Sequence, residues 1–561
     1  MVTHDNEHNF DFTLAPVQGF VGQARRTRDF WAGSYLISYL SAHAMAAVER
    51  CGGKVTFPFV DDDPLMMAVS GVVVPTSRRD VGASVASLPN RFSAQCPDAV
   101  QCGNAAVAAV QTEWHRLALG VWQAVRLKLL HFISDPQRLP ELAYADTLPP
   151  VWERQVSKHW ETYWVADGGN AGIDQRKNWR HVHLFSEQGE VCTVCGERVA
   201  CLGAGMARQT ARALWDLSDG SVLDALNYSG DHWDLALDED GKERLCAVCM
   251  VKRVLPYVGK DVIGWDLPMN FMSTHDLAGR PASTDDDDMD PPYYAVLVMD
   301  GDHLGRVLSA YPERRASISR AISHFSRAAP GIIEGESRGV SVYSGGDDVL
   351  ALLPVGNALP CANKLRALFS KECSKAGVEM KISASILCTH AKSPMQAALR
   401  TAQRLLASVA KDALGRDAFV IQVQKRSGSP LTLAKKWGEC GEVADTLLDL
   451  SDRVFSGGER SYSSRFLYNI ASLLEPFAVA RGNEHDMSGI DVVPILAAEY
   501  LRGPAALQGI DWAEAQRRMA ELYDICRWDG PTQGGRGERI LQPEGFPLLR
   551  LLAEAKEAMQ S

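Results

Sequence analysis

Three aspartates in two short motifs are the residues of this sequence best suited to chemistry. Asp347 and Asp348 close a Gly-Gly-Asp-Asp motif that lies between two apolar runs, a pattern typical of a β-hairpin. Asp300 directly follows another apolar run, at residues 294–299. Adjacent carboxylates repel each other unless a cation lies between them. If the two strands are neighbours, the three carboxylates converge and suit Mg²⁺ or Mn²⁺, which bring the phosphates of a nucleotide with them.

The glycines before the aspartates have two uses. Gly345 and Gly346 supply the positive φ of a tight hairpin and leave no side chain to block a phosphate or a base. A lone Gly-Gly-Asp-Asp is more often an ordinary turn. Its pairing with an upstream strand that ends in Asp-Gly-Asp, across a segment of helical length, favours the functional interpretation.

The elements around these motifs follow a recognisable order. Apolar periodicity predicts strand, helix, strand, Gly-Gly-Asp-Asp turn, strand, and then helix, strand, helix and strand. The helices are expected at about 303–328, 359–376 and 394–412, and the later strands at about 379–387 and 417–424. This is a ferredoxin-like βαββαβ core with additions, and it resembles the palm domain of nucleotide cyclases and many polymerases.

The bulk composition limits the class of protein. A chain of 561 residues is too long for one core, so we expect about three or four domains. The net charge of −11 and pI of about 5.7 argue against a free-standing protein that coats nucleic acid, but not against RNA contact through local basic patches within a complex. No apolar run is long enough to span a bilayer, and the polar, acidic start is no signal peptide. We therefore expect a cytoplasmic protein without membrane contact.

Two Cys-x-x-Cys pairs predict a zinc site. Cys192 with Cys195, and Cys246 with Cys249, each place two thiolates at one turn, as tetrahedral Zn²⁺ requires. With all four positions filled, the zinc is expected to be structural, and residues 196–245 form an inserted subdomain. The alternative is two unrelated pairs of reduced cysteines. Three nearby residues are expected to be core or surface residues rather than ligands: Cys201, His181 and His183.

Two further segments shape the domain organisation. The acidic, proline-containing run 282–292 is interpreted as a solvated linker rather than a metal site. After residue 431 we find no strand signal, and helices are expected at 435–455, 460–479, 491–502, 511–526 and 546–559. The glycine-rich run 530–537 has no preceding strand and no Lys-Ser/Thr, so it is not a Walker-type loop.

The first segment contains a strand at about 9–14 and a long helix whose start carries Arg25 and Arg28. One interpretation is contact with an anion or nucleotide near the start of the helix. From composition alone, the favoured interpretation is a solvated basic face, with Trp31 and Tyr35 in the core.

Together these pieces resemble a known family, the large subunit of type III CRISPR effector complexes in its Cmr-module (type III-B) form. Residues 16–21, 24–35 and 88–92 resemble the first palm of that family, the cysteine pairs its zinc-bearing insert, and residues 299–305 and 344–348 its catalytic second palm. The resulting domains are a non-catalytic first palm at 1–165, a zinc-binding helical insert at 166–285, the second palm at 286–430 and a helical domain at 431–561.

The resemblance implies an activity. Members of this family work in a crRNA-guided ribonucleoprotein with other Cmr subunits, and target RNA triggers synthesis of cyclic oligoadenylates from ATP. Asp347 and Asp348 would bind the metals, and Asp300 would complete the site. The expected nucleotide contacts are Gly345, Gly346, Ser344, Gly301 and Asp302 in the second palm, with Ser34, Arg25 and Arg28 for the acceptor nucleotide in the first.

Two other functions compete with this one. A free-standing GGDEF-like cyclase would carry Glu-Phe where Asp348 and Val349 stand. A scaffold subunit with an inactive palm would not need the intact aspartates. Many relatives begin with an HD nuclease domain, whereas the first palm is expected here from about residue 9. The isolated pairs His4-Asp5 and His275-Asp276 lack further histidines, so no DNase activity is expected.

Overall fold

The structure is a computed structural model that describes residues 7–72, 82–132, 139–178, 188–203, 215–217, 220–221, 243–279, 293–425, 428–438, 441–454, 462–477, 491–502, 509–528 and 541–560. The chain forms two compact units. The first comprises Met1–Phe271 with Val342–Gly346, and the second comprises Met272–Ser341 with Asp347–Ser561. The expected linker at 282–292 and the glycine-rich run at 530–537 lie outside the described residues.

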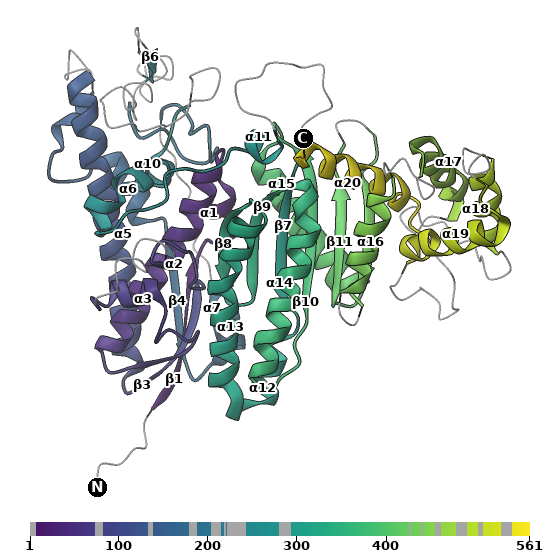
Figure 1. The fold of residues 1–561 in the computed structure, drawn as a ribbon. Helices are drawn as coiled ribbons and strands as arrows, with labels where there is room; N and C mark the ends of the chain where they lie inside the picture. The colour runs from purple at the N-terminus through teal and green to yellow at the C-terminus, as the bar shows by residue number, and fades with distance from the viewer. Residues whose placement is uncertain are drawn as a thin grey trace. The chain divides into compact units, whose positions relative to one another are not determined.

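The first unit contains a four-stranded antiparallel sheet (Figure 1). Its strands are β1 (His8–Ala15), β2 (Lys54–Phe57), β3 (Arg91–Cys96) and β4 (Glu161–Ala166), in the order β2-β3-β1-β4. The crossovers are made by α2 (Thr27–Arg50) and α5 (Ala99–Phe132), which pack against each other and the sheet. The alternating residues Phe10, Phe12 and Leu14 of β1 are fully buried. This is the strand order of a βαββαβ fold, so the predicted fold is confirmed.

The second unit repeats that order in a larger sheet. This sheet contains β7 (Tyr293–Gly301), β8 (Val340–Gly345), β9 (Asp348–Pro354), β10 (Ile382–His390), β11 (Ala418–Val423) and β12 (Leu431–Lys436), although most of β8 is grouped by its contacts with the first unit. The order is β12-β11-β10-β7-β9-β8, so the last four positions match the sheet of the first unit and two strands extend it past β10. The main helices on this sheet are α13 (Arg315–Pro330), α14 (Val355–Lys375) and α15 (Met395–Arg404), which continues as the π-helix η5 (Leu405–Ala413).

Two predictions for the second unit need correction. The helix expected at 303–328 is broken into α12 (Leu304–Ala310), a 3₁₀ turn η3 (Pro312–Arg314) and α13, because Pro312 disfavours helix at the residue before it. The region after 431 begins with a strand, β12, which pairs antiparallel with β11. The alternation of apolar and polar residues in β12 is interrupted by Lys435, which is buried although it is charged. Its aliphatic stem lies in the strand, and its ammonium donates to backbone carbonyls of α19 and of the residue after it.

The rest of the C-terminal region is helical, as predicted. Its helices are α16 (Glu442–Asp452), α17 (Ser464–Leu474), α18 (Val492–Leu501), α19 (Trp512–Cys526) and α20 (Gly545–Gln560), with the short turn η6 (Glu475–Phe477). Helix α20 packs against α14, α16, α17 and β12, so this region is joined to the sheet of the second unit. None of the described helices is long and apolar enough to cross a bilayer.

The remaining elements are short, apart from one helix. They are α1 (Gln18–Gly22), α3 (Pro64–Val69), η2 (Pro140–Ala143), α6 (Pro150–Ser157), α7 (Gly169–Lys177), β5 (Asp216–Leu217), β6 (Gly220–Ser221), α10 (Ala247–Ile263), α11 (Thr274–Leu277) and the π-turn η4 (Gly331–Glu336). The exception is α10, which begins at the second cysteine pair and packs against α2 and α5.

Candidate active site and metal centre

Strand register brings the three aspartates together. Met299 of β7 pairs with Val349 of β9, so the next pair along joins Asp300 to Asp348. The amide of Gly301 donates to the carbonyl oxygen of Asp347 at 3.2 Å. The negative charge of Asp300 lies close enough to Asp348 to raise the pKa of its carboxyl. The convergence predicted from the sequence therefore occurs at the turn between β8 and β9.

The glycines in the two motifs allow this close approach. Gly346 has a φ of +66°, a conformation that residues with a Cβ rarely adopt. A Cβ at Gly301 would lie 2.6 Å from a carboxylate oxygen of Asp347. Ser344, at the end of β8, is buried. A larger residue at position 301 would push the turn away from β7.

Lys411 is a cation at this site that the sequence analysis did not identify. Its ammonium forms an ion pair with Asp300, donates to the carbonyl oxygen of Gly301 at 3.2 Å, and lies 3.8 Å from Asp302. Its side chain is 16% exposed. Lys411 comes from η5, and such π-helical turns occur often at functional sites.

Asp302 supports the site by accepting hydrogen bonds from Ser383 and Asp417. It is 5% exposed, and both of its carboxylate oxygens accept from the hydroxyl of Ser383 at 2.9 Å. One oxygen also accepts from the amide of Asp417 at 2.9 Å. That amide is presented by a left-handed turn in which Arg416 and Asp417 have φ values of 68° and 47°. In this structure Asp302 therefore orients backbone and side chain, whereas Asp300 reaches solvent.

The crowded acidic groups raise the pKa of Asp347 and of Asp348. Burial and the nearby charge of Asp300 raise the pKa of Asp347 to about 7. Asp348 retains solvent exposure, but desolvation by the surrounding protein, followed by the charges of Asp347 and Asp300, raises its pKa well above its usual range. A bound divalent cation would lower both pKa values, because its charge neutralises the cluster.

The donor set fits a hard divalent cation, because three carboxylates at one turn supply only oxygen ligands. Asp300, Asp347 and Asp348 are the residues that would hold Mg²⁺ or Mn²⁺. A metal-ready group is one in which a single ligand atom from each residue lies within 4.8 Å of the others. Among the described residues, the three aspartates do not form such a group. Binding of a cation would therefore require Lys411 to release Asp300 and the carboxylates to rotate inward.

The four cysteines do meet that spacing. The sulfur atoms of Cys192, Cys195, Cys246 and Cys249 all lie within 4.8 Å of one another, and none of them forms a disulfide. The sulfurs of Cys195 and Cys246 are 3.8 Å apart, the edge of a tetrahedron with Zn–S bonds of about 2.3 Å. Burial and the neighbouring thiols raise the pKa of Cys246, so ionising this thiol is unfavourable in the protein alone. The charge of a bound dication would remove this cost and stabilise the thiolate.

Backbone hydrogen bonds hold the two cysteine pairs in place. The amide of Thr193 donates to the carbonyl of Arg244 at 2.8 Å, which joins the two cysteine pairs. The turn that holds Cys192 and Cys195 is closed by a hydrogen bond from the amide of Gly196 to the carbonyl of Cys192. Cys246 is the N-cap of α10, and its sulfur accepts from the amide of Cys249. Cys201 lies outside the group of four, as expected, and His181 and His183 lie outside the described residues.

The first unit places its predicted nucleotide contacts near the start of α2. Trp31 and Tyr35 are buried and stacked, with ring centroids 4.9 Å apart, which confirms their expected place in the core. Ser34 is buried in the same helix. The side chain of Arg25 is 42% exposed, and the guanidinium of Arg28 lies over the ring of Tyr257.

The isolated pair His275-Asp276 has a local explanation. Asp276 closes the capping box of α11 with Ser273, and its carboxylate accepts from the amide and the hydroxyl of that serine. The other isolated pair, His4-Asp5, lies outside the described residues.

A βαββαβ sheet with paired carboxylates at the hairpin between its second and third strands is a palm-type domain. Comparison with known proteins identifies which family of palm proteins is involved. A family model for the second palm domain of Cas10/Cmr2 matches residues 293–420, and one for the N-terminal region of the CRISPR-associated protein Cmr2 matches residues 10–119. The chain is thus similar to Cas10/Cmr2 proteins over both regions, and the resemblance seen in the sequence is confirmed.

Individual relatives agree with this assignment. The Cmr2 subunit of the CRISPR system Cmr from Pyrococcus furiosus is 37% identical over 551 aligned positions, which cover 74% of this chain and 61% of the relative. The chain thus spans less than two thirds of that relative's length. Two cryo-EM structures of type III-B Cmr-beta, one bound to cognate target RNA and one in the apo state, share the fold with TM-scores of 0.67 and 0.65. They are 12% and 13% identical, and the alignments cover 99% and 98% of this chain and 83% and 82% of theirs.

Proposed function

We propose that this protein is the large subunit of a type III-B CRISPR RNA-guided complex that makes cyclic oligoadenylates from ATP when target RNA binds. The observation that carries this proposal is the convergence of Asp300, Asp347 and Asp348 at the hairpin of a Cas10/Cmr2 second palm. The partners are the other Cmr subunits, crRNA, target RNA and ATP.

The reaction is transfer of an adenylyl group. A ribose 3′-oxygen attacks the α-phosphorus of ATP, its proton leaves, and pyrophosphate departs as the new phosphodiester bond forms. Mg²⁺ or Mn²⁺ held by the aspartates would lower the pKa of the attacking hydroxyl and neutralise phosphate charge. Asp300, Asp347 and Asp348 provide the negative field that holds such ions, and Gly345 and Gly346 leave room for the nucleotide at the turn.

Lys411 takes a role that depends on the state of the site. In the metal-free state it pairs with Asp300 and neutralises part of the acidic cluster. With nucleotide present, we assign its ammonium to the triphosphate, which is the strongest anion that the site would hold. Ser344, Gly301 and Asp302 shape the same turn. Ser34, Arg25 and Arg28 are assigned to the acceptor nucleotide of the first palm.

A scaffold function is the second candidate, and one observation favours it. The ion pair between Lys411 and Asp300, together with the spacing of the aspartates, is also what an inactive palm would have. A free-standing cyclase has less support, because the N-terminal match at residues 10–119 is to a subunit family.

Mass spectrometry of the products separates the two candidates. The assembled complex is incubated with ATP and Mg²⁺ or Mn²⁺, with either cognate or non-cognate RNA. Synthesis predicts cyclic oligoadenylates and pyrophosphate only with cognate RNA. Unchanged ATP in a complex that binds its target RNA normally would leave the scaffold function. Joining of AMP to a different acceptor would appear as another product mass in the same experiment.

A further inference from the structure

Helix α10 connects the cysteine cluster to the start of the first palm's long helix. Its first turn carries Cys249, and its N-cap is Cys246. The next two turns present three side chains to residues 18–29: Lys252, Arg253 and Tyr257. The ligands of the predicted zinc and the contacts to this segment therefore lie on one continuous helix.

Lys252 holds the end of α1. Its buried ammonium donates to the carbonyl oxygen of Phe20 at 2.7 Å and to that of Gln23. A Cβ at Gly33 of α2 would lie 3.2 Å from the Cα of Val21 and 3.7 Å from this ammonium. The backbone of α1 is thus held closely between Lys252 and α2.

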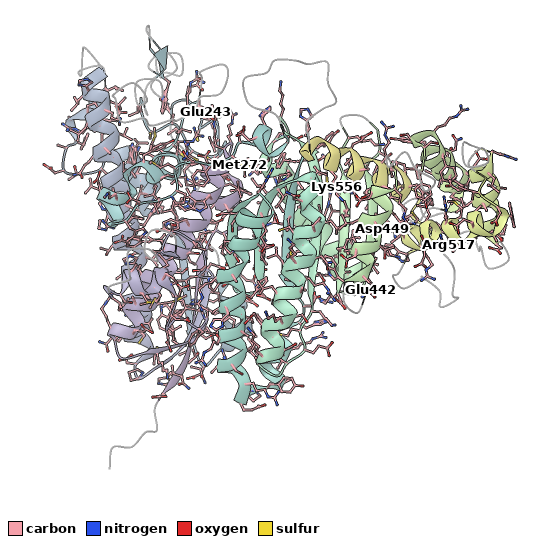
Figure 2. All side chains as sticks on the ribbon, viewed as in Figure 1. Glu243, Met272, Glu442, Asp449, Arg517 and Lys556 are labelled. Carbon is pink, nitrogen blue, oxygen red and sulfur yellow. The ribbon has the colours of Figure 1, made fainter. Side chains whose placement is uncertain are left out.

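Arg253 holds the start of α2. Its guanidinium makes a two-pronged contact with Asp29, one of whose bonds is 2.8 Å long, and donates to Glu243 at 2.7 Å. Glu243 is labelled in Figure 2. Asp29 also accepts from the backbone amides of Arg25 and Arg26. Burial opposes ionisation of Asp29, but the charge and hydrogen bonds of Arg253 outweigh it and lower the pKa of this carboxyl. Glu243 stands three residues before Cys246, so this network reaches the second cysteine pair.

The two arginines assigned to the acceptor nucleotide lie against α10 and the residues just before it. The guanidinium of Arg28 is 4.7 Å from the ring centroid of Tyr257. A side-chain nitrogen of Arg25 is 3.8 Å from a carboxylate oxygen of Glu243. Their placement depends on the backbone that Lys252 and Arg253 fix.

We propose that Lys252 and Arg253 are positioning residues through which the zinc-anchored helix α10 sets the conformation of residues 18–29, and with it the presentation of Arg25 and Arg28. The link to nucleotide binding rests on the proposed function of the first palm. The positioning of the segment does not, because it follows from buried contacts within the first unit. Both residues act through the backbone of residues 18–29, so neither is assigned a catalytic role.

Lys252→Met provides the test in the assembled complex. It keeps the length of the side chain and leaves two buried carbonyls without their donor. Hydrogen exchange of residues 18–29 is expected to speed up about tenfold or more, since local opening becomes easier, while exchange around the cysteines and the zinc content stay unchanged. Binding of a non-hydrolysable ATP analogue at the acceptor position is expected to weaken in parallel. Lys260→Met is the matched control, because Lys260 lies on the same helix with a side chain that is 74% exposed.

Each outcome decides one part of the proposal. Unchanged exchange at 18–29 in Lys252→Met overturns the positioning role. Faster exchange with unchanged nucleotide binding retains that role and overturns the function assigned to Arg25 and Arg28. If Lys252→Met does not assemble, Arg253→Lys gives the same readouts, because it keeps the charge but loses the two-pronged contact with Asp29. Failure of both variants to assemble means that the residues serve folding alone, which also overturns the proposal.

Discussion

Lys411 controls the charge of the candidate active site at the level of single residues. Its ammonium neutralises Asp300 and lies near Asp302, so it competes with any cation for the same carboxylates. The same charge is available to a triphosphate once a cation has taken its place. One residue thus stabilises the empty site and is available to bind substrate.

Lys411→Met is expected to have opposite effects on metal and on nucleotide. Mn²⁺ should bind the nucleotide-free complex more tightly, because a competing cation is gone. Oligoadenylate synthesis should fall roughly 10²-fold, the usual scale for losing one preorganised charge contact. Mn²⁺ titration and initial rates measure the two effects. Lys392→Met, at an exposed lysine of the same unit, is the control. Wild-type rates in Lys411→Met would rule out the assigned phosphate contact.

The raised pKa of Asp347 predicts that the stability of the protein depends on pH. Its folded pKa is raised to about 7, from an ordinary value of 3.8. Between these values the folded state binds more protons than the unfolded state, so this group's contribution to stability falls as pH rises. Asp347→Asn removes that penalty. Without Mg²⁺ or Mn²⁺, its melting temperature should exceed that of the wild type by an amount that grows from about pH 4 to pH 7 and then levels off.

Thermal melts at several pH values test this prediction. The gain should reach only about 1–3 °C, the size expected for roughly 1 kcal/mol or less in domains of this length, because Asp347 is partly exposed and solvent screens its charges. Saturating Mn²⁺ should reverse the order of the two proteins. Melting curves that stay parallel across the pH range would mean that the carboxyl is not perturbed.

The sequence predicted the three aspartates but not the residues that support them. Each aspartate sits in a motif whose glycines and apolar flanks can be read directly. Lys411 is a polar residue in a helical segment, like many solvated lysines, and only the packing of η5 on β10 and β11, which brings its ammonium to Asp300, gives it a role. Asp302 is predicted from the sequence as a nucleotide contact, and in the structure its oxygens accept from Ser383 and from the amide of Asp417. These contacts join distant parts of the chain, so no local pattern encodes them.

At the level of elements, periodicity worked where one face of an element is apolar. It predicted β1, β7, the hairpin and the C-terminal helices, because their buried positions recur at strand or helix spacing. It missed β12, where Lys435 is buried through hydrogen bonds to carbonyls of α19 and Arg527 rather than through apolar contact. The π-helical continuation of α15 is also absent from local signals, since its residues are ordinary helix formers.

The cysteine pairs make a prediction at the same level. Cys192→Ser with Cys246→Ser removes one ligand from each pair, so zinc content and folded yield should fall together. Structural zinc can contribute on the order of 10 kcal/mol to a small domain, and the loss should therefore be large. Metal analysis and soluble yield measure it. Cys51→Ser, at a partly exposed cysteine outside the group of four, is the control. About one zinc per chain in the double variant would contradict the assignment.

At the level of the whole molecule, the two units share a strand order but differ at the hairpin. In the second unit β8 and β9 are joined by the tight Gly-Gly-Asp turn, directly beside Asp300. In the first unit β1 ends at Leu14 and Ala15 without a carboxylate, and residues 58–90 separate β2 from β3. Among the described residues, the three converging aspartates therefore lie at the hairpin of one sheet, without a counterpart at the end of β1. This asymmetry supports a division between a catalytic palm and an acceptor palm, which the sequence predicted from the single Gly-Gly-Asp-Asp motif.

The double substitution Asp347→Ala with Asp348→Ala tests that division in the intact complex. The turn keeps its glycines, and the loss of two mutually repelling carboxylates should leave folding intact or slightly favoured in the absence of metal. Assembly and binding of target RNA should therefore match the wild type.

Synthesis should be lost in the same variant. Removing the metal ligands should cost more than the roughly 10²–10³-fold typical of a single electrostatic contact, and Asp300→Ala should have a similar effect. Product analysis and RNA binding are measured on the same preparations, with Asp276→Ala as a control at an aspartate that only caps α11. Wild-type synthesis in the double variant would mean that the hairpin is only a turn with no catalytic role. Failure of the variant to assemble would mean that the role of the hairpin is structural. Loss of product with normal RNA binding is the result that only a catalytic second palm predicts, because a scaffold would have no product to lose.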